Sequence, residues 1–272
     1  MRWRAPWFRW QGQSHIFTRF PMHQTTRPAT IRTKQSPAPF RCLSIFFSGT
    51  KRHIACAAAL AVLTAFSPSS RAEQAGGWEG LFAADLSNAQ FPEGVWTFSN
   101  GELTASEDQV IWTKNDYENF VLDLEFKTGP DANSGVIVYA SDKSQWVPNS
   151  VEIQLLDDAG PKWVKADPKW KCGAIFGRLA PSQSAAKPAG EWNHCQITCC
   201  GPKIDVVLNG QTVTSFDMTL WRSGTENPDG SKMPPWLNKP LSSHPTKGAI
   251  GLQGKHGGAP IWFRNIKIKP LG

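Results

Sequence analysis

The sequence predicts an all-β protein, an antiparallel β-sandwich or jelly roll, and three observations support that class. Short segments of alternating or continuous apolar residues recur along the second part of the 272-residue chain. Gly, Pro and Asn stand between them, and no segment repeats apolar residues with the 3.6-residue period of a helix. The chain has 23 Gly and 21 Pro but only 19% charged residues, as in a turn-rich β protein.

The first strands are expected to form a hairpin. Residues 95–98 and 102–104 flank Asn100-Gly101, and Asn-Gly between short β segments favours a tight turn. Apolar and charged residues alternate along 119–128, which predicts a half-buried strand. Residues 134–140 are almost continuously apolar, which predicts a central strand.

The same apolar patterns predict the later strands. Residues 150–158 alternate, with Val151, Ile153 and Leu155 opposite Glu152, Gln154 and Leu156. The remaining expected strands are 192–200, 204–208, 212–216, 249–252 and 261–269. Two long stretches, 157–190 and 218–246, lack such patterns, and loops of this length in a compact domain are usually functional. One domain is expected over 73–272.

Residues 1–72 are expected to be an N-terminal extension that includes a signal peptide. Lys51-Arg52-His53 precedes a mostly apolar run over 54–66, and small residues follow at Ser70 and Ala72. This is the layout of a secretory signal with cleavage after about Ala72. Thirteen residues are too few for a stable membrane span. The sequence therefore predicts export to the periplasm or the cell exterior.

The charge distribution argues against nucleic acid as a partner. The formal charge of +7 comes from 29 basic and 22 acidic residues. Eleven of the basic residues and none of the acidic ones lie in 1–72, so 73–272 carries a net charge of −4. A mildly acidic domain is compatible with a neutral sugar ligand.

Four cysteines follow the predicted signal peptide: Cys172, Cys195, Cys199 and Cys200. An even number in an exported chain permits one or two disulfides, and buried free thiols are an equal alternative. Their spacing matches no zinc-binding pattern.

The strand at 150–158 carries the first candidate site. Glu152 and Gln154 share its polar face, which we expect to line a concave sheet surface. A carboxylate and an amide side by side can bind sugar hydroxyls, and the carboxylate can transfer a proton. A merely solvated sheet face is the alternative, because any antiparallel strand shows this alternation.

A glycine-rich connection at 251–260 carries the second candidate site. It contains Gln253, Lys255 and His256, and a histidine titrates near neutral pH, as acid–base catalysis requires. Exposed indole rings are the third indication, because they stack on sugar rings. Several Trp residues fall in expected loops or at strand edges: Trp146, Trp163, Trp170, Trp221 and Trp236.

These residues resemble the 3-keto-disaccharide hydrolase domain family. The matching segments run in order through the chain: 76–82, 85–87, 96–98, 101–103, 133–136, 151–157, 172–177, 188–193, 208–210, 248–253 and 263–266. The resemblance implies a concanavalin-like jelly roll and cleavage of oligosaccharides or glycosides whose C3 hydroxyl has been oxidised to a ketone. Such a ketone acidifies the C2 proton, so a base can start elimination at C1.

The resemblance also suggests roles for individual residues. Glu152 and His256 are expected as base and acid in unassigned order, and Asp157 either orients His256 or helps to hold a divalent cation. The expected substrate-binding residues are Gln154, Lys255, Arg264 and Trp146. The sequence shows no metal motif, so a divalent cation that polarises the ketone is only an option.

Two other functions remain open. One is a non-catalytic carbohydrate-binding module of laminin-G type, which would use the same sheet and tryptophans. The other is a β-glucanase-like glycoside hydrolase, because the spacing of Glu152, Gln154 and Asp157 superficially echoes the acidic motif of that class. Gln154 stands where that motif has a carboxylate, which weakens this interpretation.

Overall fold

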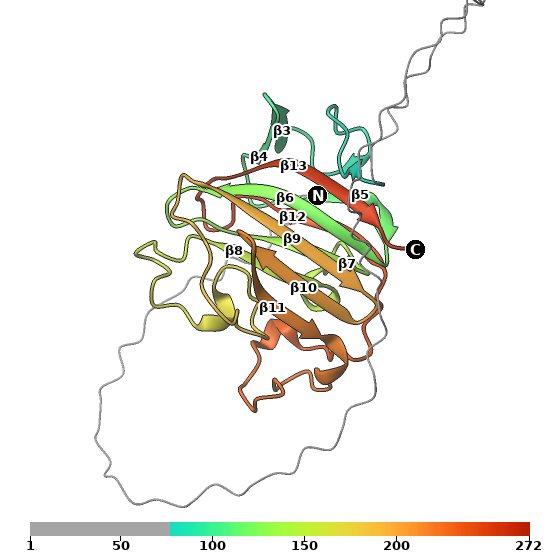
Figure 1. Ribbon diagram of the computed structural model, residues 1–272, viewed down its shortest axis with the longest axis vertical. Helices are drawn as coiled ribbons and strands as arrows, with labels where there is room; N and C mark the ends of the chain where they lie inside the picture. The colour runs from blue at the N-terminus through green and yellow to red at the C-terminus, as the bar shows by residue number, and fades with distance from the viewer. Residues whose placement is uncertain (1–76) are drawn as a thin grey trace, which may run out of the picture. The chain divides into compact units, whose positions relative to one another are not determined.

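The computed structural model describes residues 77–272, which form two antiparallel β-sheets stacked face to face (Figure 1). The larger sheet has eight strands in the order β11-β10-β9-β6-β13-β4-β3, with β1 beside β13. The smaller sheet has five strands in the order β2-β5-β12-β7-β8. This confirms the predicted all-β sandwich.

The larger sheet comprises β1 (Glu79–Gly80), β3 (Trp96–Ser99), β4 (Glu102–Ala105), β6 (Phe120–Thr128), β9 (Trp192–Cys200), β10 (Lys203–Leu208), β11 (Gln211–Asp217) and β13 (Ile261–Pro270). The smaller sheet comprises β2 (Ala89–Gln90), β5 (Val110–Tyr117), β7 (Asn133–Ala140), β8 (Val151–Leu156) and β12 (Gly248–Gln253). Short 3-10 helices lie at η1 (Val147–Asn149), η2 (Pro168–Trp170), η3 (Met218–Leu220) and η4 (Pro235–Leu237). Within residues 77–272 no helix has the length and apolar character needed to cross a bilayer.

The turn chemistry explains the observed hairpins. Asn100 and Gly101 have φ angles of 54° and 78°, and Asn209 and Gly210 have φ angles of 51° and 80°. These left-handed conformations suit a two-residue hairpin turn and are easiest for Asn and Gly. The expected β3–β4 hairpin is thereby confirmed, and β10 and β11 form a second hairpin with the same turn residues. The strand β5, which contributes to the site described below, was not among the strands predicted from the sequence.

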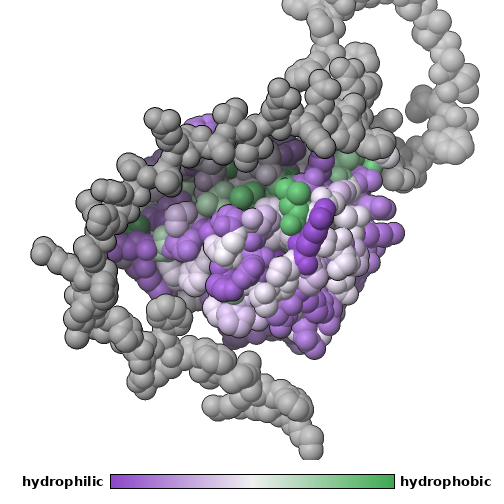
Figure 2. All heavy atoms as spheres, turned by 90° about the horizontal axis from the view of Figure 1, so that it is seen from below, coloured by the Kyte–Doolittle hydropathy of each residue, from purple (hydrophilic) through white to green (hydrophobic). Residues whose placement is uncertain are grey.

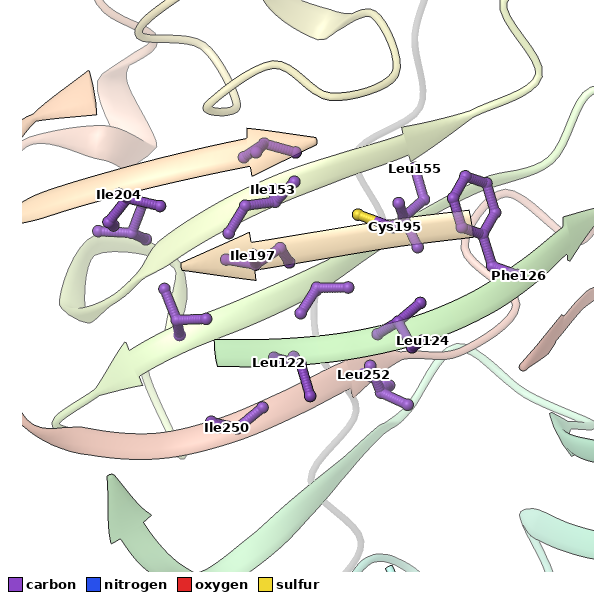
Figure 3. Packing of buried hydrophobic residues seen from close by; sticks show 14 of the residues in the cluster. Leu122, Leu124, Phe126, Ile153, Leu155, Cys195, Ile197, Ile204, Ile250 and Leu252 are labelled. Carbon is purple, nitrogen blue, oxygen red and sulfur yellow. The ribbon is translucent and has the colours of Figure 1, made fainter. Parts of the chain in front are cut away.

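The core fills the space between the two sheets. Leu122 and Leu124 of β6 point toward Ile153 and Leu155 of β8 and Leu252 of β12 (Figure 3). All five side chains are almost fully buried. Because strand side chains alternate, the residues between these core residues face away from the core. The outward-facing residues of the two sheets therefore lie on opposite sides of the sandwich.

The cysteines contribute to the core as free thiols. Cys172, Cys195 and Cys199 are buried and form no disulfide. Burial raises the pKa of the Cys195 thiol to about 12 and raises the pKa values of the other two as well. The buried-thiol alternative is therefore confirmed for these three residues.

The long loops cover the ends and edges of the sandwich. The end that carries the 218–246 loop faces the viewer in Figure 2, where hydrophilic and near-neutral side chains dominate the described surface. Trp221 anchors this loop, because its Nε1 donates to Asn227 Oδ1 at 2.9 Å. The predicted signal peptide lies outside the described residues, so it and the domain boundary at residue 73 stay predictions.

Candidate active site

The candidate active site lies on the outer face of the smaller sheet. Ile153 and Leu155 of β8 point into the core (Figure 3), so Glu152 and Gln154 face outward. Glu152 pairs with Ile137 of the neighbouring strand β7, and Gln154 pairs with Gly135. The alternating pattern of residues 151–156 thus predicted the orientation of both polar side chains correctly.

Glu152 lies in a largely apolar setting. Its carboxyl group lies over Gly135, where a Cβ atom would collide with it. Its direct neighbour Ile137 belongs to an outer apolar cluster with Trp112, Ala140 and Ala249. Burial disfavours the ionised carboxylate and raises the pKa of Glu152 to about 8. At neutral pH this group is therefore mainly a protonated acid.

A histidine–aspartate pair lies next to Glu152. His256 Nδ1 is 2.7 Å from Asp108 Oδ2, and both side chains are about half exposed. The hydrogen bond to Asp108 raises the pKa of His256, and the charges of Asp108 and Glu152 act in the same direction. Because Asp108 occupies Nδ1, Nε2 is the ring nitrogen that remains to meet a substrate.

Strand pairing brings this pair together across 148 residues of chain. Asp108 lies just before β5 and His256 just after β12, and these strands pair with Gln253 opposite Val110. A bridge between Asn133 and His256 also ties the histidine segment to the start of β7. The histidine–aspartate pair therefore depends on three neighbouring strands of one sheet, and Glu152 lies on the fourth, β8.

Lys162 adds a positive charge to the same region. Its backbone N–H donates to Asp131 Oδ1 at 2.9 Å, and its ammonium group lies 4.7 Å from the centre of the Trp163 ring. The ammonium group approaches Gly257, where an added Cβ atom would lie 3.1 Å from it. Its charge acts to lower the pKa of His256, against the larger effect of Asp108.

Comparisons with known proteins identify the family of this chain. The sequence model of the 3-keto-alpha-glucoside-1,2-lyase-like domain family matches residues 72–269. The chain belongs to this family. A curated relative from Bacteroides thetaiotaomicron, named 3-keto-disaccharide hydrolase, is 25% identical over 176 residues. That match covers 57% of this chain and 59% of the relative, so the chain spans less than two thirds of the relative's length.

Two solved structures are also similar. A crystal structure from Parabacteroides distasonis ATCC 8503, provisionally described as a glycosyl hydrolase, is 55% identical with a TM-score of 0.70. The match covers 71% of this chain and 99% of that one. A second crystal structure from this organism, with the same description, is 22% identical with a TM-score of 0.53. This match covers 72% of the present chain and 89% of the chain in that crystal structure. At that identity the second structure shows only the shared fold.

Three other predicted residues of this lyase-like domain lie near Glu152 or His256. Gln154 Nε2 donates to Asn133 Oδ1 at 2.8 Å, and Asn133 is the residue bridged to His256. Trp146 packs edge-on against Trp112 with 6.4 Å between ring centroids, on the apolar side of Glu152. Lys255 precedes His256, and its backbone N–H donates to Glu107 O at 3.0 Å. Their functional roles stay predictions.

The structure does not bring Asp157 and Arg264 into this group. Asp157 Oδ2 accepts a hydrogen bond from the Asp131 N–H at 2.9 Å, so the carboxylate against His256 is that of Asp108 instead. Arg264 lies on β13 of the larger sheet, where its Nε donates to Glu125. Because that side chain faces outward, the core separates it from Glu152.

Asp108 and Lys162 were not predicted from the sequence. Asp108 falls in a polar turn, and its importance depends on a strand pairing that no local pattern reveals. Lys162 lies within a long loop that was expected to be functional, and the adjacent Trp163 was its only signal. Among residues 77–272 no group of three or more His, Cys, Asp or Glu side chains is placed to hold a metal ion.

The contact between Glu152 and Gly135 yields a test of this lyase-like site. We expect Gly135→Ala to push the carboxyl group aside and to lower kcat/KM by about 10²-fold, because small misplacements of a catalytic group are costly. The activity should be measured in a double-mutant cycle with Glu152→Asp, whose shorter side chain makes room for the methyl group. Equal losses from Gly135→Ala in both backgrounds would contradict the proposed contact.

Proposed function

We propose that the protein cleaves 3-keto-glycosides, with 3-keto-disaccharides as the substrate class, by abstraction of the C2 proton and elimination at C1. The observation that carries this proposal is the juxtaposition of two acid–base groups with different environments. Glu152 is shifted toward its neutral acid form, whereas His256 is held by a carboxylate. Such divergent environments are typical of an acid and a base that act in one reaction. The family and the name of the curated relative support the same chemistry.

The roles follow from the two environments. His256 Nε2 removes the proton from C2, and Asp108 orients the ring and stabilises the imidazolium that forms. The C–H electron pair enters the enolate of the C3 ketone. The enolate then collapses: the C3 carbonyl returns, a C1–C2 double bond forms, and the C1–O bond breaks. Glu152 donates its proton to the departing oxygen, and the products are a 3-keto-glycal and an alcohol or sugar.

The enolate oxygen needs a hydrogen-bond donor or a positive charge. The Lys162 ammonium group supplies a charge close to His256. The Gln154 amide supplies a second N–H beyond the one it gives to Asn133. Subsequent addition of water to the glycal completes a net hydrolysis, and its release without water completes a lyase reaction.

The geometry supports the alternatives less well. A retaining glucanase needs two carboxylates about 5–5.5 Å apart on either side of the bond. Asp157, the second acid of the echoed motif, is hydrogen bonded to the Asp131 backbone. A purely binding module would have no need for an acid with a raised pKa beside a histidine–aspartate pair.

One substrate comparison tests the proposal. The purified protein is incubated with a 3-keto-disaccharide and with the same disaccharide unoxidised, and release of the leaving sugar is followed by chromatography. We expect turnover of the keto form alone. Turnover of the unoxidised sugar would instead identify an ordinary glycosidase, and binding without turnover of either would identify a binding module.

The two perturbed groups also predict a narrow pH profile. The base His256 must be neutral, so kcat/KM rises as pH passes its pKa, which the Asp108 hydrogen bond moves above the usual 6.5. The acid Glu152 must be protonated, so kcat/KM falls as pH passes its pKa of about 8. Measurement of kcat/KM from about pH 5 to about pH 10 covers both limbs of the profile. A plateau that continues well above pH 8 would contradict the assignment of Glu152 as the acid.

A further inference from the structure

A hollow lies on the outer face of the larger sheet, across the core from Glu152. Its volume is about 620 Å³, within the range of small-molecule sites. It is formed by β6, β9 and β13 together with the first residues of the described chain and the β3–β4 hairpin. No step of the proposed catalysis uses any residue of this hollow.

Aromatic side chains form one part of its wall. Phe82 and Phe98 both line the hollow, and Phe98 is one of four large apolar side chains within residues 77–272 that are exposed, at 37%. Phe82 packs on the core from the same side. Exposed aromatic faces of this kind stack against the C–H faces of sugar rings.

Acidic and basic side chains form the other part. Asp123 Oδ2 is 3.0 Å from His194 Nε2, and Asp123 Oδ1 is 3.4 Å from Lys267 Nζ. Glu125 is paired with Arg264, which stacks on Trp192 at 4.0 Å. Since each carboxylate has a basic neighbour, the wall offers hydrogen-bond donors and acceptors without a large excess charge.

A backbone irregularity in β13 contributes to the wall of the hollow. The pairing of β13 with β6 shifts register between Arg264 and Lys267, and Asn265 adopts a φ of 53°. Asn265 and Ile266 therefore bulge out of the ladder and line the hollow. Bulges of this kind redirect side chains, and here the residue after the bulge, Lys267, reaches Asp123.

We propose that this hollow is a second carbohydrate-binding site, for a neutral sugar unit of a glycan. The aromatic faces match the apolar side of a pyranose, and the paired carboxylates, imidazole and ammonium groups match its hydroxyls. The balance of charge disfavours anionic sugars and phosphates, which need an excess of positive charge. The site would hold a glycan on one side of the sandwich while the other side carries out cleavage.

Titration with unoxidised neutral disaccharides tests this site separately from catalysis. The full-length protein is titrated with maltose, cellobiose and sucrose, and with glucuronate as a charged comparison, by calorimetry or NMR. We expect at least one neutral disaccharide to bind, and Phe98→Ala and His194→Ala each to weaken that binding by about tenfold or more. Leu220→Ala removes another exposed apolar side chain, 55% exposed and on η3, and serves as the matched control.

Each result of the titrations either supports or overturns the proposed sugar site. Weaker binding in both hollow variants, with the control unchanged, supports the site, provided that thermal unfolding shows all variants folded. Absence of binding by any neutral disaccharide overturns the proposal, and so does binding that is insensitive to both variants. Binding of glucuronate at least as tight as that of the neutral sugars overturns the assignment to neutral ligands. Cleavage of the keto substrate is measured independently, so failure of either proposal leaves the other intact.

Discussion

Glu152→Gln is expected to lower kcat/KM for a 3-keto-disaccharide by about 10²- to 10⁴-fold, the usual contribution of a general acid. The amide has nearly the same shape as the protonated carboxyl group and cannot donate a proton to the leaving oxygen. Because Glu152 is mainly neutral at pH 7, the substitution removes no buried charge and should leave the folded state intact. Steady-state kinetics, together with thermal unfolding, measure the two effects separately.

Glu93→Gln is the matched control for this substitution, because Glu93 is exposed in a turn. It should leave both kinetics and unfolding unchanged. A substrate with a good leaving group, such as a 3-keto-glycoside of a nitrophenol, needs less acid assistance and should be affected less by Glu152→Gln. Full activity of the variant on the disaccharide would refute the proposed role.

His256→Gln is expected to cause a loss of similar size, because in the proposed mechanism His256 is the base that takes the C2 proton. The loss should appear equally for good and poor leaving groups, since the leaving group does not alter the need for the base. The exchange of the C2 proton with deuterium from solvent provides a direct readout, and we expect it to disappear. Exchange at the wild-type rate in His256→Gln would show that another group is the base.

In the proposed mechanism Asp108 acts through His256, so its removal should have a distinct effect on the pH profile. Asp108→Asn should lower kcat/KM less than His256→Gln does and should move the acidic limb of the pH profile down toward 6.5, since the interactions that raise the histidine pKa are lost. Asp116→Asn is the control, because Asp116 is an exposed aspartate on β5. It should change neither kcat/KM nor the position of the acidic limb. A purely structural role for Asp108 would lower activity without moving the limb.

The sequence predicted the orientation of several residues of the proposed site because strand alternation is local. The pattern over 151–156 identified Glu152 and Gln154 as outward-facing side chains, and the glycine-rich connection identified His256. Asp108 was not predicted because its neighbours form an ordinary polar turn. Only the pairing of β5 with β12 brings it to its partner His256. Arg264 was misplaced for a related reason: a strand pattern shows that a residue faces outward, but not which of the two sheets it belongs to.

The pairing of Asp108 with His256 also has a consequence for folding. Asp108 and His256 are 148 residues apart, and they meet only after β5 and β12 have paired. Contacts between residues so distant in sequence are slow to form, because a long stretch of chain must first be ordered. A nascent or refolding chain therefore lacks the acid–base pair until β12, the last strand of the smaller sheet in chain order, is in place. Recovery of activity should consequently lag behind the recovery of β-structure during refolding.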